Sequence, residues 1–541
     1  MRLFTLIGLL LTSIVSHAQK DTVYTSVSDT SGALKFENVI HLDLSNQNLT
    51  ELPAELLQCV NIEKLNLSNN NLESLPEQLI ALKKLEILIL DNNSLESLPK
   101  TFKNFKAIKE VYLNNAIKAN SISTIFGMFI KNPKLTKIEL RNNEISALPN
   151  NIKSLKALKH LDLGQNLLVH LPNNIAKMLA LHTIILSNNP ELDFEVSFDN
   201  ISQIKTLRKI DISNNGLIEI PKKVMDCRYI ATLDISNNKI TELPDRMTQL
   251  IRMKTLNAEN NEIATISNAF SLLEGLQVWK MNNNQLTTLP EGINAIAELR
   301  VLEAHNNPLT SVPENLRKLK SLETLDLGGS TLTKLGFNVG SLRTLRYLDL
   351  SSSIEDLKLE NLSTLKKLTF LNLSGIQGLY TSDAWTTIAS LSTIKTLQLN
   401  QTGLETLPED MSTLKHIEHL YLNGNNDLKI IPESIGALAN LKTLSLNGSS
   451  ISNIPSKIQN LSQLEVLSLA QLGALDINAT LTNIIPLELL ELNLTGSTLE
   501  NFPSEIPVIK AKKVILTDAK FDKKMLLYVK MAWPNAEIIT E

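Results

Sequence analysis

Few residues of this 541-residue chain have the type and spacing needed for catalysis. His416 and His419 lie three residues apart in HIEHL, where two imidazoles could reach one metal ion. The sequence contains no H-E-x-x-H motif, no clustered cysteine ligands, no G-x-S-x-G and no Gly-rich phosphate loop. We therefore expect both histidines to face solvent, and we expect no enzyme activity, no catalytic residue, no cofactor and no metal.

Carboxylates recur at a regular interval and suggest binding rather than catalysis. Glu303, Asp326 and Asp349 are spaced by 23 residues, and His305 follows Glu303 by two residues. A regular row of carboxylates suits a basic partner. The constant interval also means that one structural element, repeated along the chain, must position these side chains.

The repeated element is clear in IEKLNLSNNNLESLPEQLIALKK, which begins at Ile62. Its L-x-L core predicts a short strand with both leucines on one face. The asparagine three residues after the second leucine can satisfy backbone groups in the turn, and a leucine-proline pair precedes a run with helix-like or 3₁₀ spacing. The repeats, marked by their first strand residue, are Leu42, Leu65, Leu88, Val111, Ile138, Leu161, Ile184, Ile210, Leu233, Leu256, Trp279, Leu302, Leu325, Leu348, Leu371, Leu397, Leu420, Leu444, Leu467, Leu492 and Val514.

These repeats resemble the leucine-rich repeat superfamily over about residues 39 to 516, in the 23-residue L-P-x-x-I form of bacterial surface and Ras-group proteins. The resemblance implies an α/β solenoid of about 21 repeats, shaped as a horseshoe or superhelix. A parallel β-sheet would line its concave face, and short helical, 3₁₀ or extended segments its convex face. The resemblance also implies ligand binding, usually of proteins, on the concave face.

Stacking of the repeats decides the state of the two cysteines. No repeat can bury its leucines alone, so neighbouring repeats must stack. Cys59 and Cys227 occupy equivalent positions seven repeats apart, which at ~4.8 Å per strand is on the order of 30 Å. Because a disulfide needs Cα atoms within ~7 Å, we expect two buried free thiols on the convex side.

The two ends of the chain differ from the repeats. Arg2, an apolar stretch too short for a membrane span and small residues before Ala18 predict a signal peptide at residues 1–18, with a buried helix or uncleaved anchor as the alternative. Residues 19–38, with a short helix near Asp29 to Asn38, should cap the first repeat. Residues 517–541 should form a terminal cap with an amphipathic helix and a last strand. The predicted location is periplasmic, cell-surface or secreted.

Some repeats depart from the consensus. The turn asparagine is replaced at ten positions, seven of them between Ser330 and Ser497, and we expect hydroxyls or water to replace its hydrogen bonds there. Three enlarged repeats span residues 115–134, 190–206 and 375–393; the first should contain a helix, and Asp383 is a candidate helix cap in the third. Their aromatic residues should pack in local cores, with binding as the alternative: Phe126, Phe129, Phe194, Phe198 and Trp385.

The best candidate site lies on the concave face. One column of the predicted sheet is apolar over five consecutive repeats, and the carboxylate row runs beside it. The candidate ligand-binding residues are Val278, Val301, Glu303, His305, Asp326, Tyr347, Asp349 and Phe370. The alternative is that strands simply favour such residues. Calcium on the row is a weaker interpretation, because a flat sheet places carboxylates in a line rather than in a cage.

A secondary candidate is the apolar group Ile87, Ile89 and Tyr112. The sequence as a whole predicts a non-enzymatic, extracytoplasmic protein-binding scaffold, with cell-surface adhesion or glycan binding as the alternative. The partner would be a protein or peptide, and a basic, partly apolar surface would complement the site. The formal net charge of −4 gives no reason to expect nucleic acid, and no basic run indicates an anionic membrane.

Overall fold

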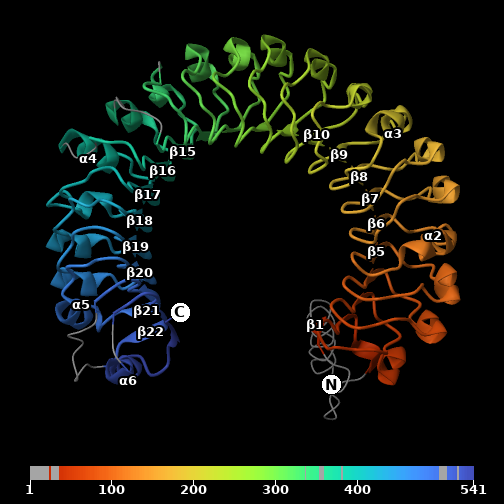
Figure 1. Ribbon diagram of the computed structural model, residues 1–541, viewed down its shortest axis with the longest axis horizontal. Helices are drawn as coiled ribbons and strands as arrows, with labels where there is room; N and C mark the ends of the chain where they lie inside the picture. Colours follow the sequence, from red (N-terminus) through yellow and green to blue (C-terminus); the bar gives the residue numbers. More distant parts are fainter. Residues whose placement is uncertain are drawn as a thin grey trace, which may run out of the picture. The chain divides into compact units, whose positions relative to one another are not determined.

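The computed structural model describes residues 23–25, 36–335, 337–352, 359–378, 382–498, 508–520 and 523–540. The predicted signal peptide lies outside these residues. The chain divides into two compact units, Met1–Asn261 (unit 1) and Glu262–Glu541 (unit 2). In each unit the strands lie on the inner side of successive coils and the helical segments on the outer side (Figure 1). Within each unit this is the predicted solenoid architecture.

Each predicted repeat contributes one parallel strand at the expected position. Strands β2 to β22 each contain the first strand residue of one repeat, and within a unit each strand pairs in parallel with the next. The strands of unit 1 are β1 (Val23–Tyr24), β2 (His41–Asp43), β3 (Lys64–Asn66), β4 (Ile87–Ile89), β5 (Glu110–Tyr112), β6 (Lys137–Glu139), β7 (His160–Asp162), β8 (Thr183–Ile185), β9 (Lys209–Asp211), β10 (Thr232–Asp234) and β11 (Thr255–Asn257). The strands of unit 2 are β12 (Val278–Lys280), β13 (Val301–Glu303), β14 (Thr324–Asp326), β15 (Tyr347–Asp349), β16 (Phe370–Asn372), β17 (Thr396–Gln398), β18 (His419–Tyr421), β19 (Thr443–Ser445), β20 (Val466–Ser468), β21 (Glu488–Asn493), β22 (Lys510–Ile515) and β23 (Glu537–Ile539).

Short 3₁₀ segments, labelled η, form most of the outer side, and many of them, such as η3 and η4, begin directly after the proline that ends the preceding turn. They are η1 (Phe36–Asn38), η2 (Ala54–Gln58), η3 (Glu77–Ala81), η4 (Lys100–Asn104), η5 (Ala119–Ser121), η6 (Asn150–Ser154), η7 (Asn173–Lys177), η8 (Lys222–Asp226), η9 (Asp245–Gln249), η10 (Asn268–Leu272), η11 (Glu291–Ala295), η12 (Glu314–Lys318), η13 (Val339–Ser341), η14 (Leu359–Thr364), η15 (Ser412–Leu414), η16 (Glu433–Ala437) and η17 (Ser456–Asn460). The α-helices of the described residues are α2 (Ile122–Phe129), α3 (Phe194–Ile201), α4 (Ser382–Ala389), α5 (Ile477–Ile484) and α6 (Lys523–Ala532).

The enlarged repeats carry three of these helices. Helix α2 confirms the prediction for the first, and α3 and α4 occupy the other two. Helix α4 begins at Ser382, and the side chain of Asp383, the predicted helix cap, lies outside what the structure describes. Helix α5 was not predicted, although Asp476 accepts a hydrogen bond from the Ala479 amide in the usual N-cap geometry. The core prediction is confirmed for the five aromatic residues, which are all buried: Phe126, Phe129, Phe194, Phe198 and Trp385.

The turn asparagines make the hydrogen bonds that the sequence predicts. In the repeat of Leu161, the side-chain amide of Asn166 donates to the carbonyls of Leu140, Leu163 and Gly164 at 2.9, 2.9 and 3.0 Å. Its Oδ1 accepts from the amides of Asn143 and Ile145 at 3.0 and 3.1 Å. One buried side chain therefore links two successive coils.

The hydroxyl replacements in unit 2 satisfy the turns unevenly. Thr402 and Ser449 donate to the carbonyls of Leu399 and Leu446, as predicted. The hydroxyls of Ser330 and Ser497 are buried without a hydrogen-bond partner among the described residues, so the hydroxyl part of the prediction does not hold at these two turns. Ser353 lies outside those residues. A hydroxyl is shorter than a carboxamide and has fewer donors and acceptors, so the turns of Ser330 and Ser497 are less well connected than the turns that keep asparagine.

Cys59 and Cys227 end the outer segments η2 and η8 and are free, buried thiols, as predicted. Burial raises the pKa of both, to about 12 for Cys227, so neither is set up as a nucleophile. At the C-terminal end, helix α6 and strand β23 match the predicted elements. At the other end, η1 covers only the last part of the predicted helix at Asp29–Asn38, and most of that range is outside the described residues. Among the described residues, no helix is long and apolar enough to span a membrane.

Candidate functional site

The predicted apolar column is continuous in unit 2. Strands β12 to β16 pair so that Val278, Val301, Thr324, Tyr347 and Phe370 are direct neighbours across the sheet. All five side chains are half-buried, because they lie on the inner face of the sheet rather than in the core. The column is therefore a surface feature that spans five coils.

The column ends in an aromatic pair. The rings of Tyr347 and Phe370 stack with centroids 4.2 Å apart and planes within 5° of parallel. Burial raises the pKa of the Tyr347 hydroxyl, and the carboxylates of Asp326 and Asp349 raise it further. The hydroxyl therefore stays protonated and can donate a hydrogen bond. A stacked aromatic pair that is partly exposed on the inner face of the sheet can contact a partner's apolar side chain.

The carboxylate row is less open than the sequence suggested. The side chains of Glu303 and Asp326 are 20% and 13% exposed, and Asp349 is 5% exposed. Glu303 pairs with the Lys280 ammonium at 2.8 Å. Asp349 accepts hydrogen bonds from the amide and hydroxyl of Ser351 at 2.8 and 2.6 Å and from Asn372 at 2.7 Å. The expectation of an open three-carboxylate row is therefore corrected: Asp349 is a structural residue that holds the end of β15.

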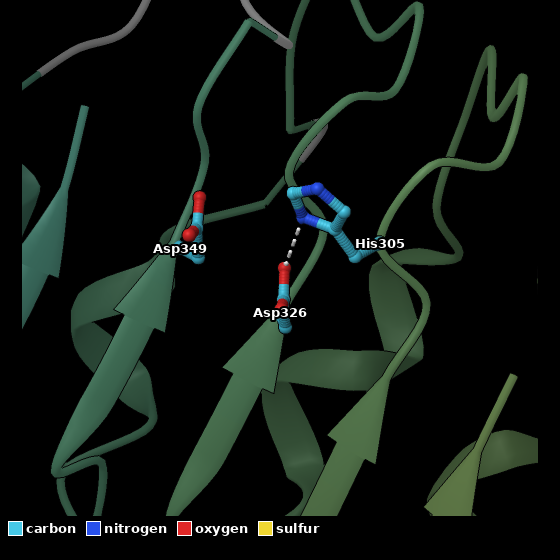
Figure 2. Close-up of side chains that lie close together, drawn as sticks. All are labelled: His305, Asp326 and Asp349. Atoms are coloured by element: carbon cyan, nitrogen blue, oxygen red, sulfur yellow. Dashed lines mark hydrogen bonds and ion pairs between the residues drawn. The ribbon is translucent and has the colours of Figure 1, made fainter. Parts of the chain in front are cut away.

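His305, Asp326 and Asp349 form a cluster at the ends of adjacent strands (Figure 2). Nδ1 of His305 lies 3.2 Å from Oδ1 of Asp326. The backbone amide of His305 donates a hydrogen bond to Oδ1 of Asn282 at 2.7 Å, which fixes the backbone at this position. The cluster exists because residue 328 is glycine. A Cβ there would lie 2.6 Å from both His305 Nδ1 and Asp349 Oδ1.

Asp326 is the electrostatically unusual member of the cluster. Burial, and then the nearby Asp349, raises the pKa of its carboxyl to about 6. Hydrogen bonds from the Gly328 amide and from His305 reduce the shift without removing it. Oδ2 of Asp326 has no hydrogen-bond partner among the described residues. A cation placed beside Oδ2 would lower the free-energy cost of keeping the buried carboxylate charged.

The cluster also bears on the question of a metal. One ligand atom from each residue lies within 4.8 Å of the others, so the sheet does not merely set these groups in a line, as the sequence suggested. Three ligands fall short of the six to eight oxygens that Ca²⁺ requires. Both oxygens of Asp349 already accept hydrogen bonds. We therefore assign no metal to the cluster.

Unit 1 contains a matched arrangement in which a permanent cation lies beside the carboxylate. The L-D-L-G sequence at 161–164 repeats that at 325–328. Burial raises the pKa of Asp162 to about 6, and the Arg141 guanidinium lies 3.5 Å from its carboxylate, in the place that His305 takes beside Asp326. Arg141 is a permanent cation, whereas a histidine such as His305 is not. The difference leaves Asp326 as a carboxylate without a permanent cationic partner.

This electrostatic cost leads to a prediction for stability. The folded pKa of Asp326, about 6, lies above the ordinary 3.8, so the folded state binds the proton more tightly. The free energy of unfolding should therefore fall as pH rises from about 4 to 6. Asp326→Asn should raise it by about 1–2 kcal/mol at pH 7.5 and by almost nothing at pH 4, measured by urea titration. The exposed control Asp427→Asn should change it little at either pH, and an equal gain in both variants would contradict the assignment.

The secondary candidate is less available. Ile89 and Tyr112 are paired neighbours on β4 and β5, and Ile87 lies on the same face. The Tyr112 hydroxyl donates to Glu110 at 2.7 Å, and the Lys137 ammonium lies 4.6 Å from its ring centroid. Because the chain itself occupies one face of the ring, we rank this site below the one in unit 2.

The two histidines of HIEHL have different surroundings. His416 is exposed in the turn before β18. His419 is half-buried on β18, with Nδ1 3.0 Å from the Thr443 hydroxyl. His416 faces solvent as predicted, whereas His419 contacts the neighbouring coil.

Comparisons with known proteins agree with this geometry. The family model described as "Leucine-rich repeat region" matches residues 187–307 and 370–506, and the model described as "Leucine rich repeat" matches residues 37–95. No curated protein sequence matches the chain.

Solved structures extend the likeness over almost the whole chain. The Leptospira interrogans LRR protein LIC12759 is 22% identical, with 96% of this chain and 99% of that chain covered and a TM-score of 0.50. The plant peptide hormone receptor RGFR1, in complex with RGF2, is 19% identical over 94% and 93% of the two chains, with a TM-score of 0.53. A TDR receptor is 22% identical over 92% and 88%, with a TM-score of 0.50. At these identities the likeness concerns the fold.

Proposed function

Because the chain belongs to the leucine-rich repeat superfamily, we propose that it is a non-enzymatic scaffold that binds a protein or peptide on the inner face of unit 2. The observation that carries the proposal is the pairing of the Tyr347–Phe370 stack with Asp326, a largely buried carboxylate that lacks a permanent cationic partner. RGFR1, a receptor with this fold, is a peptide hormone receptor solved in complex with RGF2, so the fold is compatible with such a role.

The site defines the chemistry of its partner. An apolar or aromatic side chain would lie on the column that ends at Tyr347 and Phe370. A lysine or arginine one or two positions away would reach Oδ2 of Asp326. Such a pair of contacts, an apolar anchor beside a charge in a partly desolvated site, is typical of interface hot spots.

The proposal includes an extracytoplasmic location. Its support is the predicted signal peptide at residues 1–18, and N-terminal sequencing of the exported protein tests for cleavage after Ala18. The absence of enzyme activity is likewise part of the proposal. Turnover of a substrate by the purified chain would contradict it.

Selection from a random peptide library displayed on phage tests the proposal. We expect enriched peptides to combine an aromatic or aliphatic residue with a nearby lysine or arginine. Asp326→Asn should weaken the affinity for the best synthetic peptide at least tenfold, as measured by calorimetry, because the substitution removes the charge but keeps the shape of the side chain. Asp427→Asn, on the exposed surface of the same unit, should leave its affinity unchanged.

A glycan array run in parallel tests the alternative. The Tyr347–Phe370 stack is the feature that favours glycan binding, since sugars stack on aromatic faces. Binding of glycans that depends on Tyr347, with no peptide that responds to Asp326→Asn, would replace the proposed function with glycan binding.

A further inference from the structure

One edge of unit 1 is strongly basic, although the whole chain is mildly acidic. Each coil has a turn between its outer segment and its strand. The backbone amide of one such turn donates to the carbonyl of the turn before it, as in Lys109 to Glu86, Lys159 to Thr136 and Lys254 to Ala231. These hydrogen bonds align the turns of successive coils in one row.

The basic residues of this row come from eight consecutive repeats, Leu88 to Leu256. They occupy the positions five, four and two residues before the first strand residue. We call them the basic edge: Lys83, Lys84, Lys106, Lys109, Lys134, Lys156, Lys159, Lys205, Arg208, Arg228, Arg252 and Lys254. Glu86 is the one acidic residue at the same 24 positions.

Part of this charge is not neutralised by ion pairs among the described residues. Glu86 pairs with Lys109 at 2.6 Å. Lys106, Lys156, Lys205 and Arg228 are exposed, and none of the four forms an ion pair with a described residue. Like charges held ~5 Å apart along a row repel one another, so a polyanionic surface would be attracted strongly.

Two exposed apolar side chains interrupt the row. Leu179 and Ile251 are 72% and 71% exposed. They occupy the turn position that is Lys156, Lys205 or Arg228 in neighbouring coils. Solvated aliphatic side chains among lysines are unfavourable in water but suit the boundary between lipid headgroups and acyl chains.

The arrangement favours a membrane over a nucleic acid. Successive coils of unit 1 follow an arc, so the turns of neighbouring coils lie side by side along one edge (Figure 1). Single-stranded nucleic acids are usually held by stacked aromatics, and Tyr229, the one aromatic of the row, already lies between Arg208 and Arg252. Nine of the twelve cations are lysines, which act as point charges and lack the bidentate geometry that suits single phosphates.

We propose that the basic edge of unit 1 docks the protein on the surface of an anionic lipid bilayer, with Leu179 and Ile251 inserted among the headgroups. Lysines would contact lipid phosphates without specific pairing. The basic edge belongs to unit 1 and the proposed peptide site to unit 2, so the two surfaces share no residue.

Co-sedimentation with vesicles tests the proposal. The probe is phosphatidylcholine with about 30 mol % phosphatidylglycerol, compared with phosphatidylcholine alone. The purified chain should bind the anionic vesicles, dissociate from them as the salt concentration is raised, and not bind the neutral vesicles. Equal binding to both, or to neither, would overturn the proposal.

Two sets of charge reversals locate the contact. Replacing Lys106, Lys156, Lys205 and Arg228 with glutamate should weaken binding at least tenfold. The same change at Lys100, Lys118, Lys222 and Lys239, exposed lysines of unit 1 outside the basic edge, should weaken it less than threefold. Equal losses of binding in the two sets would mean that binding depends only on the net charge of the protein, and would reject the basic edge as the docking surface. Circular dichroism confirms that both variants fold.

The apolar pair separates a bilayer from a soluble polyanion. Leu179→Ser with Ile251→Ser keeps every charge and should weaken vesicle binding about fivefold, since it removes the inserted side chains. If the same variant binds vesicles as the parent does, or if a heparin oligosaccharide or DNA duplex is bound in preference to vesicles, the lipid assignment is wrong.

Discussion

Replacing Asn166 with alanine is expected to lower the free energy of unfolding by about 3–5 kcal/mol, close to the largest effect that a single substitution produces. The side chain makes five hydrogen bonds to the backbone of two successive coils and is buried. Alanine would leave those amides and carbonyls buried without partners. Urea denaturation followed by circular dichroism measures the loss.

Asn104→Ala is the matched control for this prediction. Asn104 ends η4 in the same unit and is exposed. Its replacement should change stability by no more than about 0.5 kcal/mol. Similar losses in both variants would mean that the turn asparagines do not hold the coils together.

The second large effect concerns binding. Tyr347→Ala and Phe370→Ala should each weaken the affinity for the selected peptide at least 100-fold, which corresponds to about 2.7 kcal/mol of binding free energy. Each change removes one ring of the stacked pair and exposes the other, so the platform for the apolar anchor is lost. Calorimetry with the synthetic peptide gives the affinities.

Tyr421→Ala is the control for these variants. Tyr421 lies on β18 of the same unit, half-buried on the inner face but outside the proposed site. It should change the affinity less than threefold. An equal loss at Tyr421 would show that the inner face binds without a defined centre.

The strands were predictable because their signal is local and repeated. Each L-x-L core places two leucines on one face, and stacking of the coils leaves no other way to bury them. One repeated feature of the backbone, the positive φ of one residue in each turn, was not predicted. The residue before each buried turn asparagine, such as Asn69 or Asn92, has positive φ, a conformation that asparagine tolerates well. In later repeats glycine takes this role, as Gly329 does.

The environment of the candidate site was not predictable to the same degree. Strand register correctly brought Tyr347 beside Phe370 and Asp326 beside Asp349. The burial of Asp349 was missed, because it depends on Ser351 and Asn372 turning toward it. The glycine of L-D-L-G at residue 328 was the available signal, since it makes room for His305.

The basic edge could not be found by searching for a run of charges. Its residues are separated by whole repeats, and the intervening strands carry acidic residues such as Asp211 and Asp234. The net charge of the chain sums the basic residues of these turns with the acidic residues of the strands, and so it hides the basic edge. Aligning the chain by repeat position, once the repeat is known, brings the cations into one column.

The central claim is that the inner face of unit 2 around Asp326 and Tyr347 holds the partner. Hydrogen–deuterium exchange of the chain with and without the selected peptide tests it most directly. We expect slowed exchange confined to the segments around β13, β14, β15 and β16. Protection on the outer segments instead, or none around Asp326 and Tyr347 at saturating peptide, would contradict the account.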